Sequence, residues 1–137
     1  MSRYVYYQPN KKDLKDKCGD CTIRALSKVL DCTWVEAFDA MIPLCRKAQA
    51  SNIFDTPLAT RVELLKELNF EYHGVSVTKG HKRPTVDSFA KDHPTGRYLC
   101  NVAHHEVAVI DGKYYDTWDS GRCALYGYFE RREDKIC

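Results

Sequence analysis

Five residues in two parts of this sequence have side chains that could do chemistry together. Cys18 and Cys21 lie in the stretch KCGDCTIRAL, and His104, His105 and Asp116 lie in HHEVAVIDGKYYDTW. A cysteine becomes a nucleophile when its pKa is lowered and a histidine can take its proton. A carboxylate can then orient the histidine ring. The spacing therefore allows a metal pair, a redox pair, or one nucleophilic cysteine with partners far along the chain.

The C-x-x-C spacing of Cys18 and Cys21 is found in zinc sites and in thioredoxin-like redox motifs. A structural zinc site needs four ligands, and the remaining two would have to come from Cys100, His104 and His105, which belong to one predicted strand and its flank. A redox motif of this kind follows a buried apolar strand, whereas the charged segment KKDLKDK precedes it here. Two ordinary thiols without a function are the remaining alternative.

The nucleophile interpretation places Cys21 in the first turn of an amphipathic helix predicted over 20–30. The N-terminus of a helix stabilises a thiolate by its partial positive charge, and its free amide groups can hold an oxyanion. His105 begins a predicted strand, and a DG hairpin returns the chain along residues 113–118. Asp116 on this second strand can then reach the His105 ring.

Most of the helices that must position these residues are expected before the strands. Helices are predicted at 20–30 with Asp20 as N-cap, from the capping box TWVE at 33–36 to an end or kink at Pro43, at 56–68 and at 85–91. Strands are predicted at 3–7, 70–77, 97–103, 105–110, 113–118 and 124–130. This order indicates an α+β fold in which N-terminal helices, including the helix that carries Cys21, pack on a C-terminal antiparallel sheet.

Composition limits the classes of function. The length of 137 residues predicts a single domain over 1–137, and the net charge of +2 is too small to indicate binding to nucleic acid or to an anionic membrane. No apolar run is long enough to span a bilayer, and the start MSRYVYYQPN has no signal-peptide pattern. Seven cysteines without a regular framework favour reduced thiols in the cytoplasm. No cofactor is expected, and the oligomeric state is left open.

Both ends of the chain resemble the papain-like cysteine peptidases. KCGDCTIRAL is similar to the cysteine-bearing helix start of that superfamily, whose local signature is C-G-[SA]-C-[WY]. The segment HEVAVIDGKYYDTWDSGRCALYGYFERR, residues 105–132, resembles the family's histidine strand, its Asn-Ser-Trp motif and a later Gly-Tyr strand. The compact size and the GDC opening are similar to small bacterial and phage members such as the bacteriocin-leader peptidases.

The resemblance implies a papain-like fold and a thiol protease or related hydrolase, which cleaves a peptide, isopeptide or other amide bond of a protein or peptide through a thioester. By position, Cys21 would be the nucleophile and His105 the general base and then acid. Asp116 would orient the ring, and Trp118 would shield that hydrogen bond from water. His105 fits the family's spacing better than His104, which strand alternation points to the opposite face.

The oxyanion donor is where the chain departs from the family. The family's glutamine lies six residues before the cysteine, where this chain has Lys15. Gln8 is the candidate donor, with Asn10 as the other choice, if residues 11–17 form a looped-out insertion. The missing glutamine equally fits an alternative function, a catalytically idle binding module of the same fold. Such a module would be, for example, a phage-encoded inhibitor of a host factor, acting in the host cytoplasm.

Overall fold

The computed structural model describes residues 2–132 as a six-stranded sheet with helices on both faces. The elements are β1 (Tyr4–Tyr6), α1 (Cys21–Leu30), α2 (Trp34–Ala48), α3 (Leu58–Leu65), β2 (Phe70–Gly74), α4 (Val86–Asp92), β3 (Arg97–Val102), β4 (His105–Ile110), β5 (Lys113–Asp116) and β6 (Gly127–Arg131). Short 3-10 turns at Ile53–Asp55 and Lys66–Leu68 flank α3. The α+β class expected from the sequence is confirmed.

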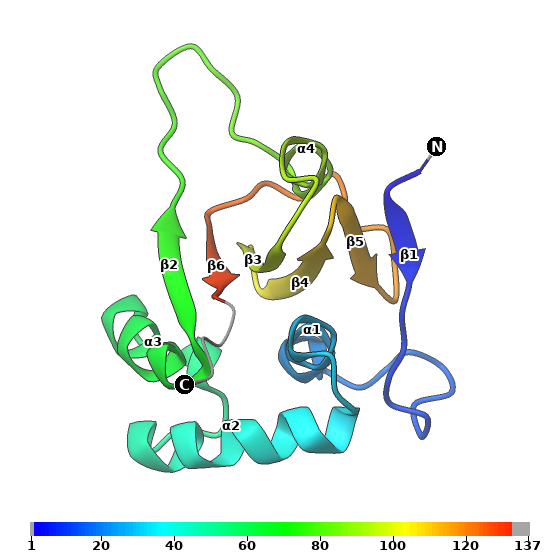
Figure 1. Cartoon of the computed structure of the whole chain (residues 1–137), viewed down its shortest axis with the longest axis vertical. Helices are drawn as coiled ribbons and strands as arrows, with labels where there is room; N and C mark the ends of the chain where they lie inside the picture. The colour runs from blue at the N-terminus through cyan, green and yellow to red at the C-terminus, as the bar shows by residue number, and fades with distance from the viewer. Residues whose placement is uncertain (1, 133–137) are drawn as a thin grey trace.

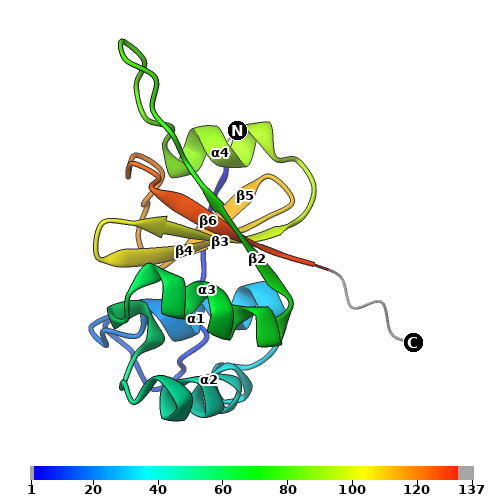
Figure 2. The same ribbon diagram turned by 90° about the vertical axis from the view of Figure 1, so that its left-hand side faces the viewer.

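The sheet has the strand order β1-β5-β4-β3-β6-β2. Helices α1, α2 and α3 lie on one side of it and α4 lies on the other (Figures 1 and 2). Four of the five strand pairs are antiparallel, but β1 pairs with β5 in parallel. The prediction of an antiparallel sheet built from the C-terminal part alone is therefore wrong at this edge. The cause is that β1 reaches β5 only after the chain has passed through all the helices, and so long a crossover permits a parallel pair.

Two apolar clusters, one on each face of the sheet, make up the core. Alternation along β4 divides its side chains between them, with Ala108 and Ile110 facing α1 and Val107 and Val109 facing α4. Large, fully buried members of the α1 side include Leu26, Leu44, Ile53, Leu65, Leu99 and Phe129. Helix α1 packs against β3, β4 and β5, so its N-terminus is fixed relative to the strands that carry His105 and Asp116.

Helix α2 runs through Pro43, where the sequence predicted either an end or a kink. The capping box is present, since Thr33 Oγ1 accepts from the Glu36 N–H at 3.1 Å and Glu36 Oε1 accepts from the Thr33 N–H at 3.0 Å. Pro43 does not end the helix, which continues to Ala48. A proline inside a helix costs about 3 kcal/mol. Burial of the apolar face of α2, which includes Met41 and Leu44, offsets that cost. Within residues 2–132, no helix has the length and apolar character needed to cross a membrane.

Candidate active site

Cys21 is the first residue of α1, directly after Asp20 at the N-cap position. The Asp20 side chain does not cap the helix, which corrects the sequence-based expectation. Its carboxylate instead binds the guanidinium of Arg24 and accepts from Trp34 Nε1 at 2.8 Å. The amide groups of the first turn are therefore left without a side-chain acceptor at the end of the helix that carries the thiol.

His105 and Asp116 meet across two neighbouring strands. His105 is the first residue of β4 and Asp116 is the last residue of β5, and the two strands form the predicted hairpin around Asp111 and Gly112. Gly112 adopts the left-handed conformation, with φ of 81°, as this tight turn requires. His105 Nε2 lies 2.6 Å from Asp116 Oδ2, which is a charge-assisted hydrogen bond.

The Asp116 carboxylate is almost completely buried and has several further partners. Ser120 Oγ donates to Oδ2 at 2.7 Å, and the Thr117 backbone N–H donates to Oδ1 at 2.8 Å. Arg24 Nη2 lies 3.4 Å from Oδ1, so this guanidinium bridges Asp116 and Asp20. Burial acts to raise the pKa of Asp116, but the hydrogen bond and charge of His105, with the Ser120 and Thr117 bonds, outweigh it and lower the pKa. The group therefore stays a carboxylate at neutral pH.

The His105 side chain and the backbone N–H of Glu106 both act on the Cys21 thiol and lower its pKa. Because Asp116 occupies His105 Nε2, the ring nitrogen left for the thiol is Nδ1. Burial acts to raise the pKa of Cys21. The hydrogen bond with His105, the Glu106 N–H, and the charges of His105 and Arg24 act in the opposite direction and prevail, so the pKa is lowered.

The pKa of His105 moves in the direction that complements the thiol. Burial of the ring acts to lower it, but the hydrogen bonds and charges of Asp116 and Cys21 prevail and raise the pKa to about 9. A lowered thiol pKa beside a raised imidazole pKa favours transfer of the proton from sulfur to the ring. The arrangement can therefore hold a thiolate–imidazolium pair, whose thiolate is the reactive form.

Trp118 lies against the His105 ring, with ring centroids 5.0 Å apart and planes inclined by 32°. Trp118 is itself 48% exposed. Its shielding of the His105–Asp116 hydrogen bond from water stays a prediction. His104 adopts a left-handed backbone conformation in the β3–β4 turn, with φ of 53°, and only His105 of the two is bonded to Asp116.

The proposed oxyanion donors have other partners in the structure. Gln8 Nε2 donates to Asp16 Oδ1 at 2.9 Å, and Asn10 Nδ2 lies 3.3 Å from Asp20 Oδ2. Residues 11–17 form a series of turns between β1 and α1, as an insertion would. Neither amide lines the cleft beside Cys21, so the role of Gln8 stays a prediction.

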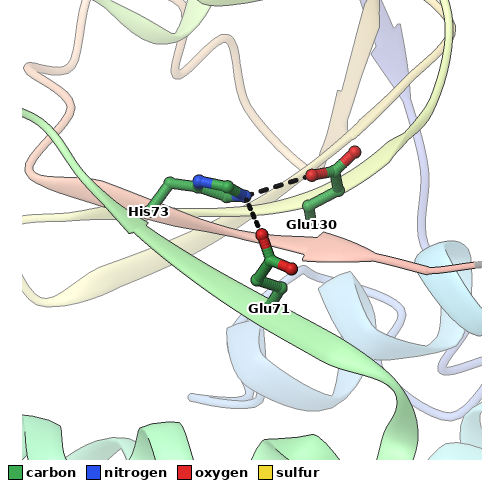
Figure 3. A group of neighbouring side chains, drawn as sticks. All are labelled: Glu71, His73 and Glu130. Atoms are coloured by element: carbon green, nitrogen blue, oxygen red, sulfur yellow. Dashed lines mark hydrogen bonds and ion pairs between the residues drawn. The ribbon is translucent and has the colours of Figure 1, made fainter.

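Cys18 differs from Cys21 in its exposure and in the direction in which its pKa is shifted. It is an exposed free thiol, and desolvation together with the charge of Asp13 raises its pKa. Within residues 2–132, the one group of three metal-type ligands whose atoms lie within 4.8 Å of one another is Glu71, His73 and Glu130, on β2 and β6 (Figure 3). The C-x-x-C pair belongs to no such group in this range.

A cleft of about 230 Å³ opens beside the Cys21 thiol. Its walls include Thr22 of α1, Arg61 of α3, and Asn101 and Glu106 of the paired strands β3 and β4. A larger apolar groove of about 730 Å³ follows α1 and α2, and it shares Thr22 and Asn52 with the cleft. An extended chain lying along both would pass the thiol.

Sequence reasoning missed Arg24, Ser120 and Glu106. For Arg24 there was a usable signal, because it lies four residues after Asp20 on the same side of an amphipathic helix. Ser120 gives a weaker signal, because it lies only four residues after Asp116 in a loop.

The assembled groups can form a thiolate, orient an imidazolium and offer helix amides to a developing negative charge.

Comparisons of the chain with models of protein families, with curated proteins and with solved structures find no match.

Proposed function

We propose that this protein is a papain-like cysteine hydrolase that cleaves a peptide, isopeptide or related amide bond through a thioester on Cys21. One observation carries the proposal. His105 is hydrogen-bonded to Asp116 at 2.6 Å, and the same ring acts on the Cys21 thiol at the start of α1. The pKa of each of these three groups is shifted in the direction that the reaction requires.

In this reaction the Cys21 thiolate attacks the carbonyl carbon of the amide, and the negative charge on oxygen is stabilised by amide groups of the first turn of α1. His105 gives its proton to the departing amine, which leaves an acyl-enzyme thioester. His105 then takes a proton from water as the water attacks the thioester. The acid is released, and the proton on His105 restores the starting pair.

Asp116 acts by holding the ring in one orientation and favouring its charged form. Its own position is overdetermined by Ser120, Thr117 and Arg24, all of which bond to its two oxygens. A ring held in this way needs no reorientation between its two proton transfers, which is the benefit of pre-organised groups.

The alternative is a binding module that has the papain-like fold but no activity. The observation in its favour is that the Gln8 amide is bonded to Asp16 and does not reach the cleft. Such a module would still contain Cys21, but nothing would require its thiol to be more reactive than that of Cys18.

Site-resolved alkylation distinguishes these functions. Wild-type protein treated briefly with iodoacetamide at pH 6 should be modified at Cys21 at least about tenfold faster than at Cys18, although Cys18 is the more exposed thiol. Hydrolysis of a mixed library of fluorogenic peptides should be lost in Cys21→Ala and retained in the matched variant Cys18→Ser. Equal, slow labelling of the two cysteines would reject the enzyme in favour of the module.

A further inference from the structure

Glu106 is a buried carboxyl group in the wall of the cleft beside Cys21. Only 6% of the residue is exposed. Its Oε2 has no hydrogen-bond partner among the described residues. Native proteins leave few buried polar atoms unpaired, so one that borders a cleft calls for an explanation. The backbone N–H of Glu106 acts on the Cys21 thiol, but the mechanism above gives the Glu106 side chain no role.

The other carboxyl oxygen of Glu106 is held in place. Asn101 lies directly opposite Glu106 in the β3–β4 pair. With the Asn101 amide oriented so that its NH2 group faces the carboxyl, Nδ2 donates to Oε1 at 3.0 Å. The bond to Asn101 fixes the side chain and leaves Oε2 as the group that lacks a partner.

Arg61 on α3 contributes a second unpaired group to the same cleft. Its Nε is buried without a partner, and its guanidinium lies over the Phe54 ring at 5.8 Å. The guanidinium charge acts on Glu106, yet the two side chains form no ion pair within residues 2–132. A donor and a carboxyl group thus border one cleft without satisfying each other.

We infer that the cleft is a specificity pocket for a carboxamide side chain, glutamine or asparagine, at a substrate position beside the bond that Cys21 attacks. This inference rests on the proposed function, whose substrate it specifies. The carbonyl oxygen of the carboxamide accepts from Arg61, and its NH2 group donates to the Glu106 carboxyl. Both unpaired groups then gain the partners that they lack.

Other side chains fit this pocket less well. A lysine or arginine side chain would meet the positive charges of Arg61 and of protonated His105. An apolar side chain would leave the two polar groups unpaired, which a site built from buried hydrogen-bonding groups penalises strongly. A carboxylate is the nearest competitor. Burial and the charge of Cys21 raise the pKa of Glu106 well above its usual value, and the protonated form of Glu106 would donate its O–H to a carboxylate oxygen.

The test uses matched peptidyl electrophiles that trap Cys21. Tripeptide acyloxymethyl ketones differ at one position only, with Gln, Glu, Lys or Leu placed first at the residue that carries the ketone and then at the residue before it. The measurement is the second-order rate constant for adduct formation on Cys21. At one of the two positions, the wild-type protein should react with the Gln probe at least about tenfold faster than with the Leu and Lys probes.

Variants then assign the preference to the pocket. Glu106→Leu should reduce the Gln-to-Leu ratio of rates to within about threefold of unity, because the acceptor is gone. Glu106→Gln should reduce that ratio as well, because its amide oxygen stays bonded to Asn101 and its NH2 group, which cannot accept, takes the place of Oε2. Each variant is judged by its own ratio, so a general change in thiol reactivity cancels. Arg61→Met, in the middle of α3, should lose the ratio independently if Glu106→Leu does not fold.

The outcomes separate this inference from the proposed function. A wild-type preference for Glu, Lys or Leu, or no preference at either position, would overturn the carboxamide pocket. An unchanged Gln preference in both Glu106→Leu and Arg61→Met would overturn it as well. Slow, unselective iodoacetamide labelling of wild-type Cys21 would instead overturn the hydrolase itself.

Discussion

Within residues 2–132, a histidine meets a carboxylate across antiparallel strands in two places, and one of them is a candidate active site. His105 lies 2.6 Å from Asp116, between β4 and β5. His73 lies 3.1 Å from Glu130 on β6 and 3.2 Å from Glu71 on its own strand (Figure 3). The side chains of His105 and Asp116 are 12% and 2% exposed, whereas those of His73 and Glu130 are 34% and 32% exposed.

The difference lies in what else each pair touches. Asp116 has three further partners, and His105 faces a thiol at a helix N-terminus. His73 stacks on the Tyr128 ring at 5.0 Å, and Glu71 is also bound by Arg132 at 2.9 Å. The proposed active site therefore differs from the His73 cluster in its burial, in the number of bonds that orient the carboxylate, and in the thiol on which the histidine acts.

Removing each histidine gives the largest expected contrast. His105→Ala deletes the partner that lowers the Cys21 pKa, while the burial that raises it remains. Alkylation of Cys21 at pH 6 should fall by about tenfold to a hundredfold, since each unit of pKa changes the thiolate fraction tenfold below the pKa. His73→Ala should leave that rate within about twofold. Equal effects of the two substitutions would show that the His105 contact has no special role.

The carboxylates give the next contrast. Asp116→Asn removes the negative charge that helps to raise the pKa of His105 to about 9, so the pKa should fall toward the ordinary value of about 6.5. Histidine ring NMR signals followed through a pH titration measure this shift directly. Asp116→Ala loses the orientation of the His105 ring as well as the charge, so it should slow Cys21 alkylation more than Asp116→Asn does. Glu130→Gln is the matched control and should not move the His105 titration, and a fall as large as that of Asp116→Asn would contradict this account.

Stability in acid should also depend on Asp116. Its folded-state pKa is lowered, so its contribution is fully present above the unfolded-state pKa of about 3.9 and is lost as pH falls through the folded value. The difference in free energy of unfolding between wild type and Asp116→Asn should therefore be constant from about pH 5 to 6 and shrink below about pH 4. Urea titrations at several pH values measure it. A difference that grew in acid would have the wrong sign.

Ser120→Ala should have the smallest effect on the site. It removes one hydrogen bond of 2.7 Å to Asp116 but leaves the bonds from Thr117 and Arg24 in place. The expected cost is about 1 kcal/mol of stability, with a change of less than about threefold in Cys21 alkylation. Calorimetry and the same alkylation assay provide the measurement. A loss as large as that of Asp116→Ala would mean that Ser120, and not the network as a whole, positions the carboxylate.

The sequence was sufficient to predict those parts of the structure that depend on local signals. The capping box at Thr33, the hairpin at Asp111–Gly112 and the strand at 105–110 all arise from residues close together in the chain, and the structure contains them. The pairing of His105 with Asp116 followed from that hairpin alone. Cys21 could be placed at a helix start, although the predicted cap by Asp20 was wrong because distant Trp34 competes for its carboxylate.

The remaining features depend on contacts between distant segments, which periodicity does not encode. Glu106 lies at an alternating strand position that nothing in the sequence distinguishes from others. It becomes a buried carboxyl group beside a thiol only because residues of α1 and α3 line the same cleft. The bridge by Arg24 needs the fold of the sheet as well as the helix. The parallel pairing of β1 with β5 has no local signature, because nothing in residues 3–7 specifies a partner more than a hundred residues away.

That parallel edge has a consequence for when the site forms. Tyr6 of β1 is in register with Asp116, and the Tyr7 N–H donates to the Asp116 carbonyl at 2.9 Å. The Tyr4 hydroxyl reaches the same carbonyl across 112 residues of sequence. Contacts between such distant segments form late in folding, because closing the intervening loop costs entropy before any contact repays it. Cys21 precedes His105 and Asp116 by more than eighty residues, so a growing chain contains the thiol well before the groups that act on its pKa.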